Sequence, residues 1–117
     1  MKIGTDIIQI DRILKLIDKY GNTFKYKYLC DEEITMIKKM ETYAGLWAAK
    51  EAISKALGCG ICSNLSFHDI IISKDKSGAP SFTLSDTAQK IYKISSSSLS
   101  ISHDGGFAIA VVALVTE

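Results

Sequence analysis

The residues best suited to chemistry lie on one predicted helix, from about Thr42 to Gly58. At about 100° per residue, its polar residues fall on one stripe, and alanine and aliphatic side chains fill the remainder. The stripe holds Lys50, Glu51, Ser54, Lys55 and Gly58. Two cations and one carboxylate can hold phosphates and a metal. The alternative is a solvent-exposed face on which Glu51 and Lys55 pair, which stabilises a helix by only about 0.3–0.5 kcal/mol.

Asp6 is the second candidate, because it interrupts an apolar strand. The segment from Lys2 to Ile10 alternates with a period near two, which predicts a β-strand, and aspartate is disfavoured in strands. An unpaired carboxylate among isoleucines is unfavourable, so a neighbouring helix N-terminus or a hard cation should neutralise it. Mg²⁺ typically takes one or two protein carboxylates, so Asp6 and Glu51 together would suffice.

The cysteines offer a different chemistry. Cys59 and Cys62 form a C-x-x-C pair, and Cys30 stands apart. Redox pairs of this kind owe their low thiol pKa to a helix N-terminus, whereas this pair follows a helix. Zinc would need two more ligands, which no second pair supplies. Ordinary free thiols are the favoured interpretation, and a redox protein acting through Cys59 and Cys62 is an alternative.

The elements that must position these residues begin with the strand at the N-terminus. The apolar spacing then predicts a helix over Asp11–Tyr20, with Asp11 as N-cap and Gly21 as the stop. Apolar residues at helical spacing, with acids early and lysines late, predict a second helix over Asp31–Glu41. The helix that carries the polar stripe follows, and no linker separates these elements.

The second half of the chain is richer in β-strand signals. Ser66–Ser73 and Pro80–Leu84 flank a turn-forming segment and predict a hairpin. Ser85 is expected to cap a short helix, and Ser95–Ser98 to form a connection. Two further β-runs surround a predicted three-residue link, Asp104-Gly105-Gly106. This order predicts an α+β fold with a largely antiparallel sheet.

One domain over residues 1–117 fits the length and composition. The chain has 117 residues and a mass of 12.8 kDa, with 47% hydrophobic and 23% charged residues. Domains cluster near about 100–150 residues, so two cores would be too small. The composition excludes collagen-like and disordered chains. A domain of this size leaves large sites to be completed by contacts between subunits.

Charge excludes several classes of partner. The chain carries 14 cations and 13 acids, a formal charge of +1, without a long basic run. Its one arginine is Arg12, and arginine is the residue that most often reads bases, so no nucleic-acid partner is expected. Asp6 interrupts the first apolar stretch far short of a signal segment or membrane span. The prediction is a cytoplasmic protein without a membrane partner.

Three separated segments form a recognisable set, IGTDIIQIDRI near the start, WAAKEAISKALG in the middle and SISHDGGFAIAVV near the end. Together they resemble the 4′-phosphopantetheinyl transferases, and in particular the small holo-acyl-carrier-protein synthases. With SFHDIII and SGAP between them, the resemblance spans nearly the whole chain. A joint match of three motifs in this order is far more specific than any one of them.

The resemblance implies a homotrimer with coenzyme A in a cleft between neighbouring subunits. It implies that Asp6 and Glu51 hold Mg²⁺ against the coenzyme pyrophosphate. The other residues implied near the coenzyme are Lys50, Ser54, Lys55, Gly58 and His103, with Ser77, Gly78 and Pro80 of the SGAP turn near its adenine end. It also implies that the acidic helix of acyl carrier protein docks on a basic first helix.

The basic first helix has a counterpart in the residue spacing. Arg12, Lys15 and Lys19 fall at i, i+3 and i+7, on one exposed stripe of the helix over Asp11–Tyr20. Such a stripe is a solvated face unless something acidic docks on it. Arg12 carries over from the family motif, and the two lysines follow from their spacing.

The implied reaction transfers 4′-phosphopantetheine from coenzyme A to a serine of apo-acyl carrier protein, for fatty acid biosynthesis. The serine hydroxyl attacks the β-phosphorus, and adenosine 3′,5′-bisphosphate leaves. Lys55 is the candidate for stabilising charge on the leaving group, and Glu51 or a metal-bound water for accepting the serine proton. The alternative is a non-catalytic module that binds coenzyme A or a nucleotide and transfers nothing.

Some positions depart from the family pattern. Leu46 stands where many small members have an arginine, which indicates that one phosphate or docking contact is missing. Lys27 and Cys30 stand where arginine and a hydroxyl residue are frequent, and Asp31 or Glu33 is expected to compensate for Cys30 at the helix start. Ala79 replaces a frequent lysine, so weaker contacts are expected at the nucleotide end.

Overall fold

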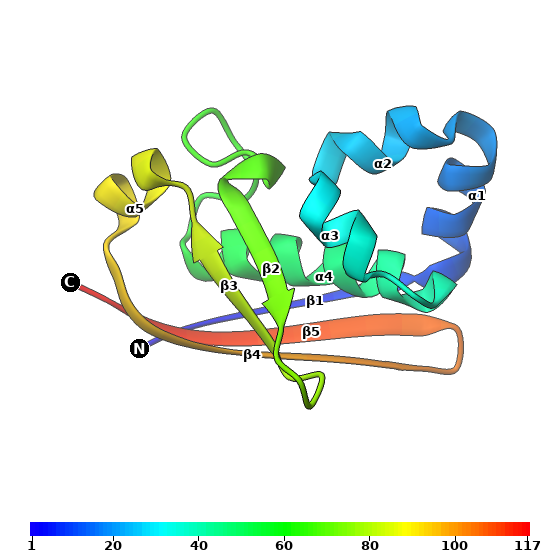
Figure 1. Cartoon of the computed structure of the whole chain (residues 1–117). Helices are drawn as coiled ribbons and strands as arrows, with labels where there is room; N and C mark the ends of the chain where they lie inside the picture. The colour runs from blue at the N-terminus through cyan, green and yellow to red at the C-terminus, as the bar shows by residue number, and fades with distance from the viewer.

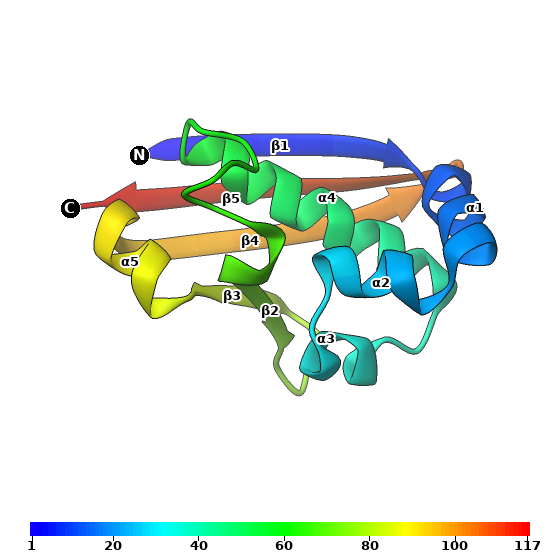
Figure 2. The same ribbon diagram turned by 90° about the horizontal axis from the view of Figure 1, so that it is seen from above.

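The computed structural model describes residues 1–117 and is built around one long helix, α4 (Met40–Ala56). A three-stranded sheet lies against one side of this helix (Figure 1). Shorter helices and a two-stranded sheet lie on its far side and along its flank (Figure 2). All strand pairs are antiparallel, which confirms the predicted α+β fold.

The three-stranded sheet has the order β1-β5-β4, with β1 at Lys2–Gln9, β4 at Ile94–Asp104 and β5 at Phe107–Thr116. Its inner face packs on α4, and residues of the opposite face alternate with the buried ones. Gly105 and Gly106, with φ of 57° and 85°, form the turn between β4 and β5. Two successive residues with positive φ are typical of a two-residue hairpin turn. The turn in the structure is therefore one residue shorter than the predicted three-residue link.

The N-terminal helices begin with α1 (Ile10–Tyr20), whose start differs by one residue from the prediction. Asp11 lies inside the first turn and is not the N-cap, although a carboxylate there still suits the helix dipole. Gly21, with φ of 57°, ends the helix as predicted. A second short helix, α2 (Asn22–Tyr28), follows directly and was not predicted.

The predicted helix over Asp31–Glu41 is wrong in extent. The structure has α3 at Asp31–Met36, and Lys38 and Lys39 lie in the connection to α4. Glu33 is fully buried in an ion pair with a residue of α4, and this contact orients α3. Tertiary packing therefore ends a helix that the local sequence would have continued.

The second β-sheet is the predicted hairpin, made by β2 (Ile70–Lys74) and β3 (Pro80–Leu84). It begins later than predicted, because residues Phe67–Asp69 form a turn of 3₁₀ helix. Ser85 caps α5 (Asp86–Tyr92) as predicted, its hydroxyl accepting from the amide of Ala88 at 3.3 Å.

The predicted connection at Ser95–Ser98 is wrong, because these serines belong to β4. Their backbones pair with β5, so the strand is held by its neighbour despite a weak strand propensity. No helix of the chain has both the length and the apolar composition that crossing a membrane would require.

An aromatic cluster joins α4 to the outer layer. Trp47 of α4 stacks on Phe24 with ring centres 5.8 Å apart, and it meets Phe67 at 4.9 Å. Tyr28 lies edge-on to Trp47 and is fully buried. This cluster, with the sheet on the opposite side, leaves α4 buried along most of its length.

Candidate active site

Asp6 and Lys55 form the first contact of the candidate site. Asp6 lies on the face of β1 that packs on α4, and Lys55 lies in the last turn of that helix. The ammonium nitrogen Nζ of Lys55 donates to Oδ1 of Asp6 at 2.8 Å. The side chain of Asp6 is 13% exposed and that of Lys55 is 53% exposed. A lysine that keeps contact with solvent therefore neutralises the carboxylate of the strand.

Glu51 lies one turn before Lys55 on α4 and is partly buried. Burial raises the pKa of its carboxyl above the ordinary value of a glutamate, the charge of Asp6 raises this pKa further, and Lys55 lowers it. An effect of one carboxylate on another requires them to lie near each other. The structure thus brings Asp6 and Glu51 together on one side of α4, with Lys55 beside them. The predicted Glu51–Lys55 ion pair is replaced by the pair between Lys55 and Asp6.

Gly4 explains how β1 comes so close to α4. A Cβ atom at this position would collide with the carbonyl oxygen of Ala52 and would lie 2.8 Å from the amide nitrogen of Ala56. Both alanines also have the smallest side chain that a chiral residue offers. Small residues on strand and helix therefore set the short separation that places Asp6 beside the polar end of α4.

The donor set of this cluster fits a hard cation. The chain has no group of three or more His, Cys, Asp or Glu residues placed to hold a metal. Structural zinc needs four ligands, whereas Mg²⁺ takes one or two protein carboxylates and fills its octahedron with water and phosphate oxygens. Burial raises the pKa of Glu51 most, and the charge of Asp6 raises it further, a repulsion that a divalent cation would relieve. Asp6 and Glu51 therefore suit Mg²⁺.

Lys50 does not belong to this cluster, and the prediction that it shares one site wall with Glu51 and Lys55 is wrong, whereas its place near coenzyme A stays a prediction. Its side chain is fully buried, and its ammonium donates to three oxygens. These are the carbonyl of Tyr28 at 2.6 Å, Oε1 of Glu33 at 2.8 Å and the carbonyl of Phe67 at 3.1 Å. The prediction failed because α4 is covered on two sides, so part of its polar stripe faces protein instead of solvent.

Ser54 does not reach the candidate site either. It is fully buried, and its hydroxyl donates to the carbonyl of Glu51 at 2.7 Å, within its own helix. Gly58 lies beyond the end of α4, where it is exposed and has φ of 84°. Of the five residues on the predicted stripe, Glu51 and Lys55 reach the candidate site, and Gly58 lies on the surface at the end of the same helix.

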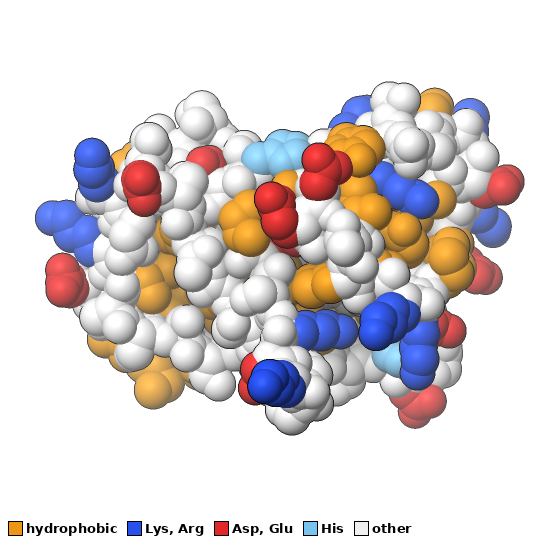
Figure 3. Space-filling model, in the orientation of Figure 1, with side chains coloured by type: hydrophobic (Ala, Val, Ile, Leu, Met, Phe, Trp, Pro, Cys, Tyr) orange, Lys and Arg blue, Asp and Glu red, His pale blue; other side chains and the backbone are white.

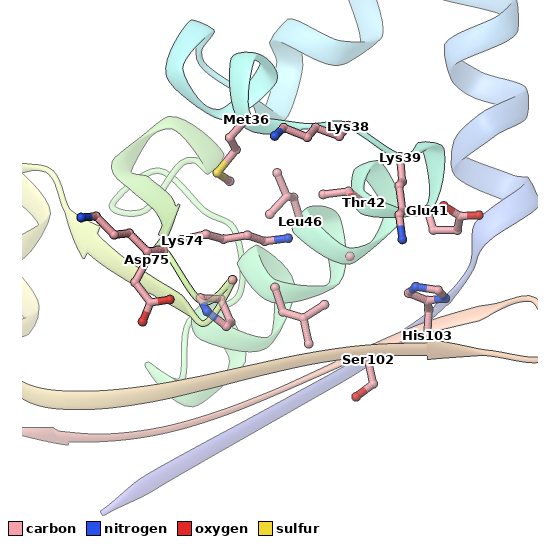
Figure 4. Close-up of a pocket in the computed structure, with 15 residues that line it drawn as sticks. Met36, Lys38, Lys39, Glu41, Thr42, Leu46, Lys74, Asp75, Ser102 and His103 are labelled. Carbon is pink, nitrogen blue, oxygen red and sulfur yellow. The ribbon is translucent and has the colours of Figure 1, made fainter.

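A separate cavity of about 610 Å³ opens between the β2–β3 turn, the start of α4 and the end of β4. Gly78, Pro80 and His103 line it, so the structure brings together three residues expected near the coenzyme (Figure 4). Asp6, Glu51 and Lys55 do not line this cavity. One chain therefore carries two separate groups of candidate residues.

Lysines give this cavity a cationic lining that the sequence analysis missed. The four are Lys38, Lys39, Lys74 and Lys76. Figure 4 shows the ammonium groups of Lys39 and Lys74 entering from two walls, and Figure 3 shows basic side chains gathered beside the β2–β3 turn. Lys38 and Lys39 precede α4, whereas Lys74 ends β2 and Lys76 lies in the β2–β3 turn, so no single periodic pattern joins them. Such a lining suits phosphate groups.

Asp75 shapes the turn that forms one wall of the cavity. Its Oδ1 accepts from the amide of Ser77 at 2.8 Å, the hydroxyl of Ser77 at 2.6 Å and the amide of Ala79 at 3.0 Å. These hydrogen bonds lower the pKa of the Asp75 carboxyl. Ser77, expected near the coenzyme, does not line the cavity, because its hydroxyl points to Asp75. It supports the turn that carries Gly78.

The structure shows the surroundings of the residues that depart from the family pattern. Leu46 is fully buried and contributes to the cavity floor, so no cation enters from that position. Glu33 compensates for Cys30, since its Oε1 accepts from the amide of Cys30 at 3.0 Å. Ala79 is exposed on the turn, where its amide bonds to Asp75.

The basic stripe of the first helix lies on the surface. Arg12, Lys15 and Lys19 are all exposed on α1, at the end of the molecule opposite α5 (Figure 1). Ile13 and Ile17, between them in sequence, are buried against the core. The stripe is therefore available to an acidic partner.

Comparison with known proteins matches residues 2–112 to the 4′-phosphopantetheinyl transferase superfamily. The holo-[acyl-carrier-protein] synthase of Sulfurovum sp. is 70% identical over 100% of this chain and 98% of its own length. The enzyme of the same name from Campylobacter jejuni is 54% identical over 98% of this chain and 100% of its own length.

Solved structures give the same result. The holo-[acyl-carrier-protein] synthase of Helicobacter pylori, in complex with coenzyme A, superposes with a TM-score of 0.93 and 46% identity. The match covers 97% of this chain and 99% of that one. A Bacillus anthracis synthase in complex with CoA (3′,5′-ADP) superposes with a TM-score of 0.82 and 37% identity, over 99% and 96% of the two chains.

Proposed function

The chain belongs to the 4′-phosphopantetheinyl transferase superfamily, and from this we propose how its residues carry out the reaction of a holo-[acyl-carrier-protein] synthase. The reaction transfers 4′-phosphopantetheine from coenzyme A to a serine of apo-acyl carrier protein, in support of fatty acid biosynthesis. Adenosine 3′,5′-bisphosphate is the other product. The observation that carries the assignment of residues is the convergence of Asp6, Glu51 and Lys55.

Asp6 and Glu51 would hold the metal of this reaction. Bound Mg²⁺ would neutralise the two phosphates of coenzyme A and so make the β-phosphorus open to attack. The carboxylates are fixed by β1 and α4, two regular elements in close contact, which supports a site that needs little rearrangement. Coenzyme A is the co-substrate, and its pyrophosphate lies beside the same two residues.

Lys55 neutralises charge on the departing phosphate. Its side chain is half exposed, and its ammonium, which donates to Asp6, has further hydrogens that could contact a phosphate oxygen. A fixed cation at the place where negative charge grows stabilises the transition state more than the ground state. Lys55 therefore acts as an electrostatic catalyst.

Glu51 is also the candidate acceptor for the serine proton. Glu51 lies beside Asp6 and Lys55, which supports a role close to the reacting phosphorus. Proximity and charge neutralisation supply the remaining rate enhancement.

The nucleotide end of coenzyme A occupies the cavity lined by lysines, with His103, Gly78 and Pro80 at its walls. This cavity does not contain the acidic cluster of its own chain. We therefore place each complete site between two subunits of a homotrimer, where the acidic cluster of one copy faces the cavity of the next. The apolar outer face of the three-stranded sheet supports such an assembly.

That outer face is the largest apolar surface of the sheet. Its exposed residues from β1 and β5 are Ile3, Ile7, Phe107, Ile109, Val111 and Val115. Ile7 and Ile109 are paired across the two strands and are 60% and 41% exposed. Apolar groups contiguous over two strands are typical of a surface covered by another protein copy.

Apo-acyl carrier protein docks on α1. Arg12, Lys15 and Lys19 present three cations at helical spacing, which complement an acidic helix. Such charges mainly accelerate encounter and orient the partner, so this contact delivers the carrier serine to the site. A single domain over residues 1–117, with one continuous core, carries all these surfaces. Three free cysteines support a cytoplasmic location.

The experiment that tests this function combines the purified protein, coenzyme A, Mg²⁺ and apo-acyl carrier protein, with mass spectrometry of the carrier. We expect the carrier to gain the mass of one phosphopantetheine group. Binding of coenzyme A without a mass gain would favour the non-catalytic binding module instead. Glu51→Gln should abolish the gain and remain folded. Unfolding of this variant would indicate that Glu51 is structural.

The redox alternative has its own control. A variant with both Cys59→Ser and Cys62→Ser should transfer phosphopantetheine at the wild-type rate, because neither thiol lines the lysine cavity and the Cys59 thiol contacts Tyr92 and the carbonyl of Ser54. Loss of transfer in this variant would assign the pair to the reaction.

A further inference from the structure

The segment after α4 brings sulfur and phenol groups together at a place that the transfer reaction does not use. The hydroxyl of Tyr92, on α5, donates to Sγ of Cys59 at 3.2 Å. The Cys59 thiol lies 3.9 Å from the carbonyl oxygen of Ser54, in the last turn of α4. Cys59 is exposed, so reagents in solution reach it.

Cys62 completes this group. Its sulfur lies close enough to the side chains of Cys59 and Tyr92 for both to affect its pKa, and the backbone of Asn64 and Leu65 also contributes. The hydrogen bond from the backbone of Asn64 is the largest of the effects that lower the pKa of Cys62. Burial raises the pKa of Cys59. Cys62 is thus the more acidic of the two thiols.

The backbone of this segment suits a small ring. Gly60, between the two cysteines, has φ of 64°, and its amide donates to the carbonyl of Ser54 at 3.1 Å. Cys62 pairs with Leu65 in an isolated β-bridge. The turn therefore folds back on the end of α4 and holds both sulfurs on the side that faces Tyr92.

A metal is a poor fit for the pair. No third His, Cys, Asp or Glu joins the two sulfurs in a group that could hold an ion. Structural zinc is bound by four ligands. Two neighbouring thiols without further ligands suit oxidation chemistry instead.

We propose that Cys59 and Cys62 form a reversible disulfide site that reacts with hydroperoxides. The Cys62 thiolate attacks the terminal OH oxygen of the hydroperoxide, and the O–O bond breaks. The other oxygen leaves as hydroxide from hydrogen peroxide or as alkoxide from an organic hydroperoxide, and the sulfur becomes a sulfenic acid. The Cys59 sulfur then attacks this sulfenic sulfur and forms the S–S bond. The sulfenic oxygen leaves as water with the proton of Cys59. Two electrons pass from the sulfurs to the peroxide, and a small thiol restores the reduced pair.

Tyr92 is the positioning residue of this site. Its hydroxyl holds the Cys59 sulfur beside Cys62, and the neighbouring thiols raise the pKa of the phenol, so it remains a donor. Removing the hydroxyl leaves the ring on α5 and frees the Cys59 side chain to rotate away. The rate of disulfide closure should then fall while the chain stays folded.

The test treats the purified wild-type protein with hydrogen peroxide, then alkylates the remaining thiols under denaturing conditions and measures the intact mass. We expect the loss of two hydrogen atoms and a single alkylation, at Cys30, in a chain that is not cross-linked to another. Dithiothreitol should restore three alkylations. Cys30→Ser is the matched control and should close the same disulfide at the wild-type rate.

Three results would overturn the proposal. Independent alkylation of Cys59 and Cys62 after peroxide treatment would show that the pair does not close. Irreversible oxidation of either sulfur without a disulfide, or a disulfide between two chains, would also contradict it. Tyr92→Phe, with a closure rate several-fold lower than wild type, tests the positioning step, and an unchanged rate would remove Tyr92 from the site.

Discussion

At the scale of single residues, the pKa of Glu51 leads to a first prediction. This pKa is raised by burial and by Asp6, so the metal-free folded protein is stabilised when Glu51 is protonated and loses that stabilisation as pH rises through the raised value. Mg²⁺ needs the carboxylate, so its affinity should fall by about tenfold per pH unit below that value. Thermal melting with and without Mg²⁺, across pH, measures both effects.

A matched control separates Glu51 from the other carboxylates. Glu51→Gln should remove most of the Mg²⁺-dependent rise in melting temperature and its pH dependence. Asp18→Asn, at an exposed position of α1, should leave both unchanged. A Mg²⁺ response that survives in Glu51→Gln would contradict the assignment of this residue as a metal ligand.

The buried ion pair of Lys50 and Glu33 leads to a second prediction. Lys50→Met removes the cation, leaves Glu33 charged in the core and deprives two carbonyl oxygens of their donor. Removing one partner of a buried pair typically destabilises a protein by about 3–5 kcal/mol. Urea unfolding should show a loss of this size. Lys50→Met combined with Glu33→Gln should recover part of it, and a single variant as stable as wild type would contradict the structural role.

The role of a residue could be predicted only where the sequence reveals the surroundings of its side chain in the fold. Asp6 was identified because a carboxylate within an apolar strand needs a partner. Lys50 and Ser54 were misplaced because helical spacing gives direction around a helix and says nothing about what covers each side. The lysines around the cavity were missed because they come from two distant segments, the connection before α4 and the β2–β3 hairpin, that meet only in the folded chain.

At the scale of elements, the contact of β1 with α4 controls the acidic cluster. In Gly4→Ala the new Cβ would meet the carbonyl oxygen of Ala52 and lie 2.9 Å from Cβ of Ala56. Backbone atoms cannot move aside as a side chain can, so β1 must shift away from α4, and Asp6 shifts with it. Overpacking of this kind typically costs about 1–3 kcal/mol. Both the melting temperature and the Mg²⁺ response should fall.

Gly45→Ala provides the matched comparison. Its Cβ would lie 3.0 Å from Cγ2 of Ile101, a side-chain atom that has room to adjust. We expect a smaller loss of stability than for Gly4→Ala and an unchanged Mg²⁺ response. Equal effects of the two variants would show that the close approach at Gly4 does not position Asp6.

The exposed stripe of α1 gives the fourth prediction. Reversing Lys15 and Lys19 to glutamate should raise the KM for apo-acyl carrier protein by about tenfold, equivalent to about 1.4 kcal/mol, and leave coenzyme A binding unchanged. The effect should shrink at high salt, because these charges are exposed. Lys90→Glu, on α5 at the other end of the molecule, is the control. An unchanged KM in the α1 variant would refute this docking face.

Helices and strands were predicted where the signals of the local sequence agreed with the tertiary packing. The two hairpins, α4 and the cap at Ser85 were predicted because turn residues and apolar runs coincide there. The short helix α2 was missed because it has no capping side chain and is held by aromatic contacts with Trp47. The serines of β4 lack strand propensity, and their pairing with β5 decides their conformation.

At the scale of the whole molecule, the separation of the acidic cluster from the lysine cavity argues for assembly. A coenzyme that must touch both needs a second copy to supply the missing half. The apolar outer face of the sheet supplies the surface on which copies can meet. Burying apolar side chains there stabilises the assembly by about 25 cal/mol per Å² of area removed from water. Function and oligomeric state should therefore be lost together.

Ile109→Lys tests this coupling, because the residue lies on β5 at the middle of the outer face and pairs with Ile7. A charge there cannot be buried between copies without a large desolvation penalty, so the assembly should dissociate. Sedimentation velocity should show a trimeric wild type and a monomeric variant. Transfer to the carrier should fall by orders of magnitude, although Asp6, Glu51 and Lys55 stay in place within each chain.

The control is Ile91→Lys, at a residue that is half exposed on α5, away from the sheet face. This variant should remain trimeric and active, which separates the effect of the site from that of adding a lysine. A monomeric wild type with full activity would place the complete site within one chain. A monomeric Ile109→Lys variant with undiminished transfer would show that the cavity of a neighbouring subunit is not needed.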